Sequence, residues 1–148
     1  KNIHNYNVIM MIQLLPVNKA DYKFLCELLS QRNPNVNISH KKMPTFDKHV
    51  KFVMSKPYSK WYIIYNNNEK IGSVYLSKQD EIGIFIKNNM QKKGIGQKAM
   101  HILMSKNPRK RFLANINPKN TESIRFFKKN NFKLIQYTYE LMKESIDD

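Results

Sequence analysis

The stretch that decides the fold of this 148-residue chain is Ile82-Gly83-Ile84-Phe85-Ile86-Lys87-Asn88-Asn89-Met90-Gln91-Lys92-Lys93-Gly94-Ile95-Gly96-Gln97. Its first residues are mostly β-branched or aromatic, which favours a strand. A short basic loop follows, and the pair Gly94-x-Gly96 opens a helix. The first turn of a helix presents unpaired N–H groups and the positive end of the helix dipole, and glycines let an anion approach the backbone. The stretch therefore predicts an anion-binding turn between a strand and a helix.

A dinucleotide-binding fingerprint is one alternative, because Gly94-x-Gly96-x-x-Ala99 has the required spacing. That fingerprint places its first glycine directly after the strand and an acidic residue about twenty positions further on. Here seven residues separate Ile86 from Gly94, and no acidic residue lies near Asn115. The Gly-x4-Gly-Lys-Ser/Thr pattern of a P-loop is absent as well. An ordinary basic loop at the start of a helix remains the other alternative.

Hydrophobic periodicity predicts the elements on both sides of this stretch. Apolar and alternating runs predict strands at 11–15, 61–65, 71–76, 81–86, 111–116 and 132–142, the last being one or two strands. Helical spacing predicts helices at 21–31, 45–56, 94–105 and 117–131, with Thr45 and Asn117 as N-caps and Asn130-Asn131 at the last helix end. Short gaps between the middle strands permit only hairpins, whereas the helical crossover before 111–116 makes that strand parallel to its predecessor. We therefore predict a mixed α/β (α+β) fold, in the order β-α-α-β-β-β-α-β-α-β-β, with a mainly antiparallel sheet and helices on both faces.

The chain is strongly basic, with 26 Lys and Arg against 11 Asp and Glu and a formal charge of +15. Such a charge attracts nucleic acid, an acidic membrane surface or phosphorylated small molecules. It is equally typical of a composition biased toward Lys and Asn, as in Asn66-Asn67-Asn68. Because the lysines are spread along the chain and no nucleic-acid motif is present, a nucleic-acid-binding module is only an alternative.

Organisation and compartment follow from composition and length. We expect residues 1–10 to be an N-terminal extension or an expression remnant and 11–148 to form a single domain. The only cysteine, Cys26, cannot form a disulfide within the chain, which suits a cytoplasmic protein. No apolar run approaches the roughly 20 residues of a membrane-spanning helix, so no membrane partner is expected.

Two motifs in the second half of the chain resemble those of a known family. Gln91-Lys92-Lys93-Gly94-Ile95-Gly96 resembles the Q/R-x-x-G-x-G/A signature of the GNAT superfamily of acyl-CoA-dependent N-acetyltransferases. The block from Asn120 to Phe132 resembles that family's N-x-x-A/S-x-x-F-Y-x-K-x-G-F run. Both motifs have the family's order and separation, and the resemblance extends over residues 11–142. It implies a GNAT-like fold and acetyl-CoA as co-substrate.

The resemblance also implies which residues bind acetyl-CoA. Backbone N–H groups of residues 92–97 would hold the pyrophosphate. The strand at Ile84 would pair with the pantetheine arm and direct one N–H at the thioester carbonyl, and Asn120 would lie near the sulfur. The expected cofactor-binding residues are Ile84, Phe85, Ile86, Gln91, Lys92, Lys93, Gly94, Ile95, Gly96, Gln97 and Asn120.

The reaction implied is direct attack of an amine on the thioester, which needs a base. Glu81 is the candidate because it opens the strand on which several family members carry a catalytic glutamate; the alternative is a solvated carboxylate at the strand edge. Two positions depart from the family. Phe127 replaces the tyrosine that protonates the sulfur, and Asn115 replaces a glutamate that serves some members as base. Either Tyr137 or Tyr139 supplies the acid, or the thiolate leaves unaided.

No metal site is expected. His40 and His49 lie nine residues apart with no further ligand nearby, and His101 falls within a helix, where it is predicted to be a surface residue. Cys26 is predicted to be a small core residue rather than a nucleophile.

The sequence thus predicts an N-acetyltransferase that acts on a primary amine of a small molecule, with a nucleotide-linked amino sugar slightly preferred. Cationic and aromatic residues that suit an anionic acceptor are His40, Lys41, Lys42, Trp61 and Tyr75. The alternatives are a protein or peptide amine as acceptor, a family member that binds CoA without catalysis, and the nucleic-acid-binding module. A monomer or a homodimer is expected.

Overall fold

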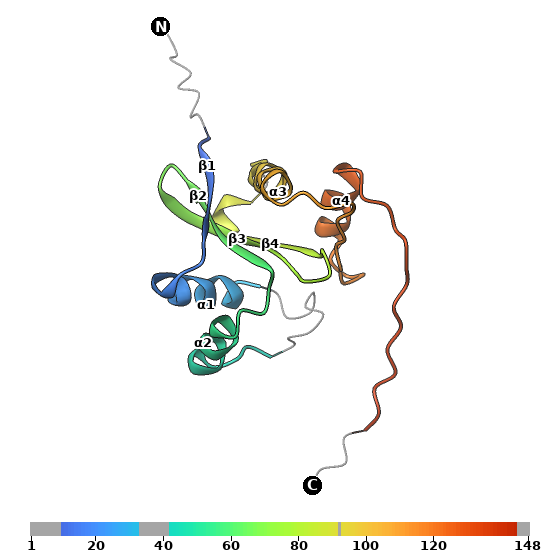
Figure 1. Cartoon of the computed structure of the whole chain (residues 1–148). Helices are drawn as coiled ribbons and strands as arrows, with labels where there is room; N and C mark the ends of the chain where they lie inside the picture. The colour runs from blue at the N-terminus through green and yellow to red at the C-terminus, as the bar shows by residue number, and fades with distance from the viewer. Residues whose placement is uncertain (1–9, 33–41, 92, 145–148) are drawn as a thin grey trace, which may run out of the picture.

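The computed structural model describes residues 10–32, 42–91 and 93–144. Its centre is a four-stranded antiparallel sheet in the order β1-β2-β3-β4 (Figure 1). Along the chain the elements are β1 (Ile12–Pro16), η1 (Lys19–Asp21), α1 (Tyr22–Ser30), α2 (Phe46–Met54), β2 (Lys60–Asn66), β3 (Glu69–Leu76), β4 (Ile82–Ile86), η3 (Asn88–Met90), α3 (Ile95–Lys106) and α4 (Thr121–Lys129).

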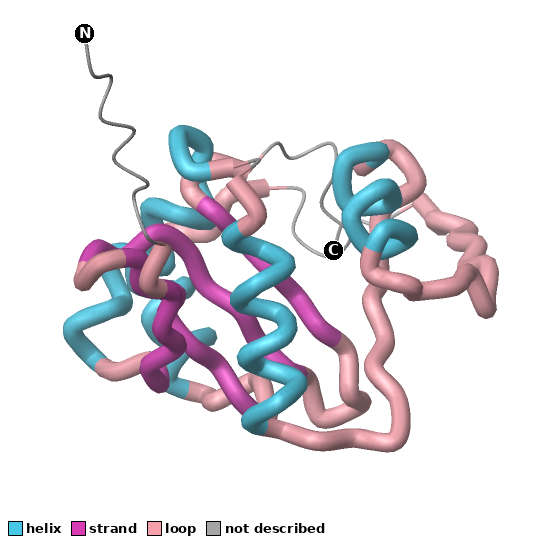
Figure 2. The backbone as a smooth tube through the Cα atoms, turned by 90° about the horizontal axis from the view of Figure 1, so that it is seen from above, coloured by secondary structure: helices cyan, strands magenta, loops and turns pink. Residues whose placement is uncertain are grey.

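Helices cover both faces of the sheet, as predicted. In Figure 1, α1 and α2 lie below it and α3 lies above it, while α4 stands beyond β4, and Figure 2 shows α3 running across the strands. Strand β2 contributes to a hydrophobic cluster on each face of the sheet, because successive side chains of a strand point to opposite faces. Ile64 packs in the cluster beneath α3, whereas its neighbour Ile63 packs with Leu25 and Val53 of α1 and α2.

The turn between β2 and β3 has the backbone that a tight hairpin requires. Asn67 and Asn68 connect Asn66 to its partner Glu69, and both have positive φ, 49° and 67°. Two left-handed residues in a row match the twist of antiparallel strands, and asparagine tolerates that conformation better than most residues. The predicted meander from β2 to β4 is therefore present.

The structure contradicts the strands predicted after α3. Residues 111–116 form only one parallel bridge, between Leu113 and Glu81, although its direction is the predicted one. Ile82 N–H donates to the Leu113 carbonyl at 2.8 Å and Leu113 N–H donates to the Asp80 carbonyl at 2.9 Å, with no ladder beyond them. No strand is assigned at 132–142 either, where the alternating side chains of Ile135 and Tyr139 are 69% and 90% exposed. An alternating pattern forms a strand only beside a partner that accepts its hydrogen bonds.

The start of α4 also differs from the prediction. Asn117 forms a turn in which its side chain accepts from Lys119 N–H at 2.9 Å. The N-cap is Asn120, whose Oδ1 accepts from Ser123 N–H at 3.2 Å. Asn117 and Asn120 are both good capping residues, so local sequence alone did not separate them. The helix end is as predicted, because Asn131 has a left-handed φ of 69°.

The extension predicted at residues 1–10 lies outside the described residues except for Met10. Within the described ranges, no helix has both the length and the apolar character needed to cross a membrane.

Gly72 of β3 provides a test of the sheet. A Cβ added there would lie 2.2 Å from the Phe85 carbonyl oxygen and 3.2 Å from Ile86 Cα, both on β4. Because these are backbone atoms of the paired strand, we expect Gly72→Ala to lower the free energy of unfolding by about 1–3 kcal/mol, as overpacking does. Urea denaturation measures this. The control is Gly96→Ala, whose Cβ would lie 3.4 Å from the Phe126 ring; equal stability of the two variants would contradict the prediction.

Candidate functional site

One side of β4 is open. The other side is paired with β3 along the whole strand, from Leu76↔Ile82 to Gly72↔Ile86. On the open side, among the described residues, the sole ladder contact is the bond from Ile82 N–H to the carbonyl of Leu113. Successive N–H groups of a strand point to alternate sides. The N–H groups of Ile84 and Ile86 therefore point the same way as that of Ile82, toward the open side.

The N-terminus of α3 presents a second set of backbone donors. Gly94 precedes the helix in the left-handed region, with φ of +76°, and no side chain caps it among the described residues. The first helical bond runs from Lys98 N–H to the Gly94 carbonyl at 3.2 Å. The N–H groups of Ile95, Gly96 and Gln97 come before that bond and are directed out of the helix end. This end of the helix has the donors and the dipole that bind an anion.

A cavity of about 810 Å³ joins the open side of β4 to this helix end. Three cations from α4 and the turn before it line the cavity, Lys119, Arg125 and Lys129, against one carboxylate, Glu122. The loop between β4 and α3 is braced by Gln91, whose Nε2 donates to the Ile86 carbonyl at 3.1 Å. The cavity thus combines a cluster of cations with a length of unpaired strand.

Most of the residues predicted to bind the cofactor line this one cavity: Ile84, Phe85, Ile86, Gln91, Gly94, Ile95, Gly96, Gln97 and Asn120. Lys93 is exposed and does not line it, and Lys92 lies outside the described residues. Sequence analysis missed the contribution of α1 and the residues directly after it, which add Leu28, Gln31 and Arg32. Gln31 is fixed there because its side chain accepts from Asn88 N–H at 3.1 Å.

A second cavity, of about 330 Å³, adjoins the first. The two meet along β4 and α4, where they share Arg32, Ile84, Phe85, Asn120, Ser123 and Phe127. The smaller cavity extends toward the start of β4 and the aromatic residues after α2. Ligands in the two cavities would therefore meet beside the open side of β4.

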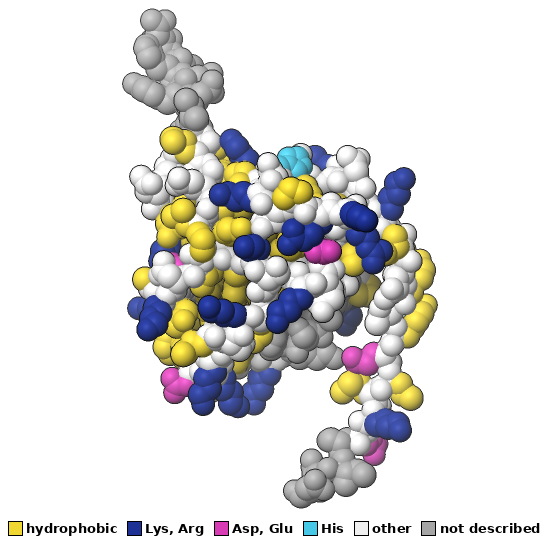
Figure 3. Space-filling model, in the orientation of Figure 1, with side chains coloured by type: hydrophobic (Ala, Val, Ile, Leu, Met, Phe, Trp, Pro, Cys, Tyr) yellow, Lys and Arg dark blue, Asp and Glu magenta, His cyan; other side chains and the backbone are white. Residues whose placement is uncertain are grey.

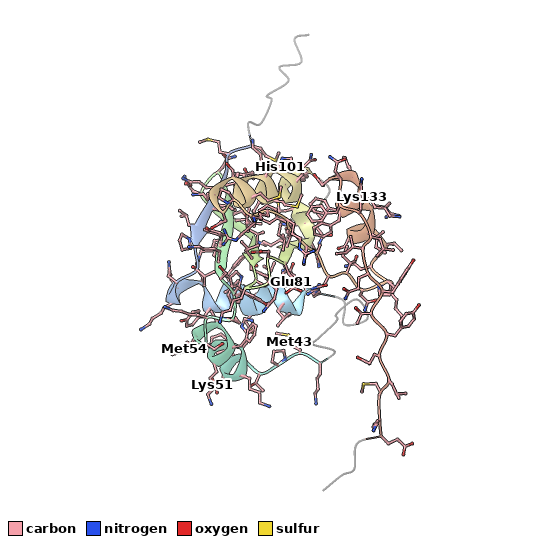
Figure 4. All side chains as sticks on the ribbon, turned by 45° about the vertical axis from the view of Figure 1, so that its right-hand side comes forward. Met43, Lys51, Met54, Glu81, His101 and Lys133 are labelled. Atoms are coloured by element: carbon pink, nitrogen blue, oxygen red, sulfur yellow. The ribbon has the colours of Figure 1, made fainter. Side chains whose placement is uncertain are left out.

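Glu81 lines the smaller cavity and is held there by two side chains. Ser77 Oγ donates to Glu81 Oε1 at 2.9 Å and also accepts from the Glu81 N–H at 3.0 Å. Asn115 Nδ2 donates to the other carboxylate oxygen. Since Glu81 pairs with Leu113, Asn115 comes two residues further on the same side, which explains this contact. Glu81 is half-buried, and in the view of Figure 4 it lies between α3 and α2.

Aromatic side chains form one wall of the smaller cavity. The Tyr58 and Tyr75 rings stack with centroids 3.7 Å apart and planes 3° apart, and Trp61 meets Tyr58 edge-on at 4.8 Å. Burial raises the pKa of both tyrosines, so their hydroxyls keep their protons at neutral pH. Tyr137 and Tyr139, the acids considered from sequence, are 74% and 90% exposed and line neither cavity.

Other candidate residues do not join the site. The described part of the chain holds no group of three or more His, Cys, Asp or Glu that could bind a metal ion. His101 is exposed on the outer side of α3, away from Glu81 (Figure 4). Cys26 is half-buried in α1, and burial raises the pKa of its thiol. Lys and Arg side chains are scattered over the face in Figure 3 rather than gathered in a stripe.

Comparison with known proteins shows the family of the chain. The model of the acetyltransferase (GNAT) family matches residues 22–132, and the chain therefore belongs to that family. It is an acyltransferase of the N-acetyltransferase type, with acetyl-CoA as co-substrate. No curated protein matches the chain.

Solved structures share the fold at low identity. A domain from Methanocaldococcus jannaschii is 24% identical with a TM-score of 0.77, covering 89% of this chain and 94% of its own. An aminoglycoside N-acetyltransferase in complex with CoA is 15% identical with a TM-score of 0.68, covering 93% and 97%. RimL, a ribosomal L7/L12 alpha-N-protein acetyltransferase in complex with coenzyme A, is 17% identical with a TM-score of 0.68, covering 84% and 81%. The predicted fold class is confirmed.

Gly96 tests the larger cavity. We expect Gly96→Glu to weaken acetyl-CoA binding more than about tenfold, because a carboxylate at the helix start repels phosphate. A Cβ there would lie 3.4 Å from the Phe126 ring, an ordinary van der Waals contact, and circular dichroism of the variant checks that α3 is still folded. Isothermal titration calorimetry with acetyl-CoA measures the change. Ser105→Glu, at the other end of the same helix, adds the same charge and should bind normally; equal loss in both variants would contradict a local site.

Proposed function

We propose that this protein transfers the acetyl group of acetyl-CoA to a primary amine of a small molecule. The proposal depends mainly on one observation, the meeting of two cavities beside β4 with Glu81 in the smaller one. At about 330 Å³, that cavity lies at the low end of the range for small-molecule sites, which favours a small acceptor over a protein surface.

The larger cavity fits acetyl-CoA on the chemistry of its lining. The N–H groups of Ile95, Gly96 and Gln97 and the cations of the α4 region suit the pyrophosphate and phosphate groups. The unpaired N–H groups of Ile84 and Ile86 suit the amides of the pantetheine arm. Lys92 and Lys93 were predicted to add charge at this end, and the exposed Lys93 would do so from outside the cavity.

The proposed roles in the reaction follow from position. Acetyl-CoA supplies the acetyl group as an activated thioester. Glu81 accepts a proton from the acceptor's ammonium group, directly or through water, and Ser77 and Asn115 hold its carboxylate in place. Ile84 N–H donates toward the thioester oxygen. The proton that leaves the nitrogen is balanced by one that the CoA thiolate takes up from water after it leaves unaided.

The candidate acceptors are small-molecule amines and protein amines. A nucleotide-linked amino sugar was preferred on sequence, but of its expected contacts Tyr75 alone lines the cavity; Lys42 is exposed, and His40 and Lys41 lie outside the described residues. One structural neighbour is named for an aminoglycoside and another for a ribosomal protein N-terminus, so their names support both a small-molecule and a protein amine. We favour the small molecule because of the size of the cavity.

The setting proposed is cytoplasmic, with residues 11–148 as a single catalytic domain that acts as a monomer or a homodimer. The single cysteine suits such a compartment.

Glu81 tests the proposed chemistry. We expect Glu81→Gln to lower kcat by about 100-fold or more, because an amide cannot accept the proton. The affinity for acetyl-CoA should stay within twofold of the parent, since Glu81 does not line the larger cavity. Thiol release with a panel of amines and calorimetry with acetyl-CoA measure the two quantities. Glu27→Gln, on the exposed side of α1, is the matched control.

An unchanged kcat in Glu81→Gln would remove Glu81 as the base. Binding of acetyl-CoA by the parent protein with no thiol release from any amine would favour the non-catalytic alternative.

A further inference from the structure

Arg32 lies where the two cavities meet, just beyond the end of α1. It lines both of them and is half-buried. Its guanidinium carbon lies 4.1 Å from the ring centroid of Phe85, a residue of β4. A guanidinium stacked on an aromatic ring keeps the N–H groups at its edge free for other acceptors. The stacking therefore holds the side chain in one orientation without using its hydrogen bonds.

Arg32 has no carboxylate partner within the described part of the chain. The ion pairs found there join Lys70 to Asp21 and Arg109 to Asp80. Burial lowers the pKa of Arg32, and the nearby Tyr75 and Tyr58 raise it. Partial removal of a cation from water without a counter-charge costs some free energy, even for a half-buried arginine. A ligand that brings an anionic group would recover that cost.

The smaller cavity therefore contains one group of each charge. Glu81 is held by Ser77 and Asn115, and Arg32 is held by Phe85. Glu81 and Arg32 do not form an ion pair with each other, so each keeps its charge for a ligand. A molecule with an ammonium group at one end and an anionic group at the other would match both.

We propose that the acceptor is an amine that also carries a carboxylate or a phosphate, with this anionic group bound by Arg32 and the ammonium group at Glu81. The inference rests on the proposed function. Both anions match the planar fork of a guanidinium, which can donate two parallel hydrogen bonds to them. The stacked rings of Tyr58 and Tyr75 line the same cavity and suit the carbon skeleton of the acceptor.

The competing role for Arg32 is to bind acetyl-CoA, since it also lines the larger cavity. The two roles predict different kinetics. A residue that binds the acceptor changes the kcat/KM for anionic amines alone, whereas one that binds acetyl-CoA changes the affinity for acetyl-CoA and the rates with all amines.

The test measures thiol release from acetyl-CoA with matched pairs of amines. One set pairs amino acids with their amides, and the other pairs phosphoethanolamine with ethanolamine and amino-sugar phosphates with the free amino sugars. The variants are Arg32→Met, which keeps the packing on Phe85, and Arg32→Lys, which keeps the charge but loses the fork. Arg111→Met is the control, because Arg111 is exposed and lines neither cavity.

We expect the anionic member of the preferred pairs to have at least about tenfold higher kcat/KM in the parent protein, the size of a charged hydrogen bond. Arg32→Met should abolish that preference, Arg32→Lys should keep part of it, and Arg111→Met should leave it unchanged. The affinity for acetyl-CoA should stay within twofold in all three. The two sets of pairs decide between carboxylate and phosphate.

Neutral amines that react as well as anionic ones would overturn the inference, as would equal losses for both members of each pair in Arg32→Met. Weaker acetyl-CoA binding in Arg32→Met would assign the residue to acetyl-CoA instead. If acetyl-CoA binds and only the neutral members of the pairs release thiol, the proposed acceptor class is wrong. If acetyl-CoA itself does not bind, the proposed function fails, which is a separate result.

Discussion

Strand β4 is paired along its whole length with β3 alone, and both cavities exist because its other side is left open beyond a single bridge. If residues 112–116 had continued the ladder begun at Leu113, the N–H groups of Ile84 and Ile86 would have been used within the sheet. Because that segment leaves β4 after one bridge, the donors stay free and the space beside them stays open. Unpaired backbone donors in a cavity are costly. A ligand that offers carbonyl groups along the strand can satisfy them, so the open side favours an extended amide-containing ligand.

Groups that attract anions and the carboxylate of Glu81 lie at opposite ends of β4. Anion-binding donors gather where β4 ends and α3 begins, and the carboxylate of Glu81 lies at the other end of the strand. Among the described Lys and Arg residues, Arg32, Lys119, Arg125 and Lys129 line the larger cavity, and many others are scattered over the face shown in Figure 3. The helix end and its neighbouring cations act at short range, where screening by salt is weakest. The net charge of +15 is therefore a poor guide to the ligand, while the local arrangement is a good one.

Sequence analysis predicted the elements whose information is local. The hairpin at Asn67-Asn68, the N-cap at Thr45 and the glycine turn at Gly94 depend on the conformational preferences of single residues, and all three are present. The strand predicted at 132–142 failed although its alternation is clear, because pairing is decided by a distant partner. Arg32 was missed for the same reason, since nothing within α1 indicates that Phe85 and two cavities lie beside its end.

By itself, the sequence determined the order and type of most elements, the family and the position of the glycine turn before α3. These depend on periodicity, on capping residues and on motifs within a few positions of one another. Only the tertiary structure decided that 112–116 leaves β4, that Asn115 orients Glu81, and that Arg32 faces the same cavity as Glu81. Those are contacts between segments 30 or more residues apart. Their geometry is set by the packing of distant segments against one another, which no local pattern specifies.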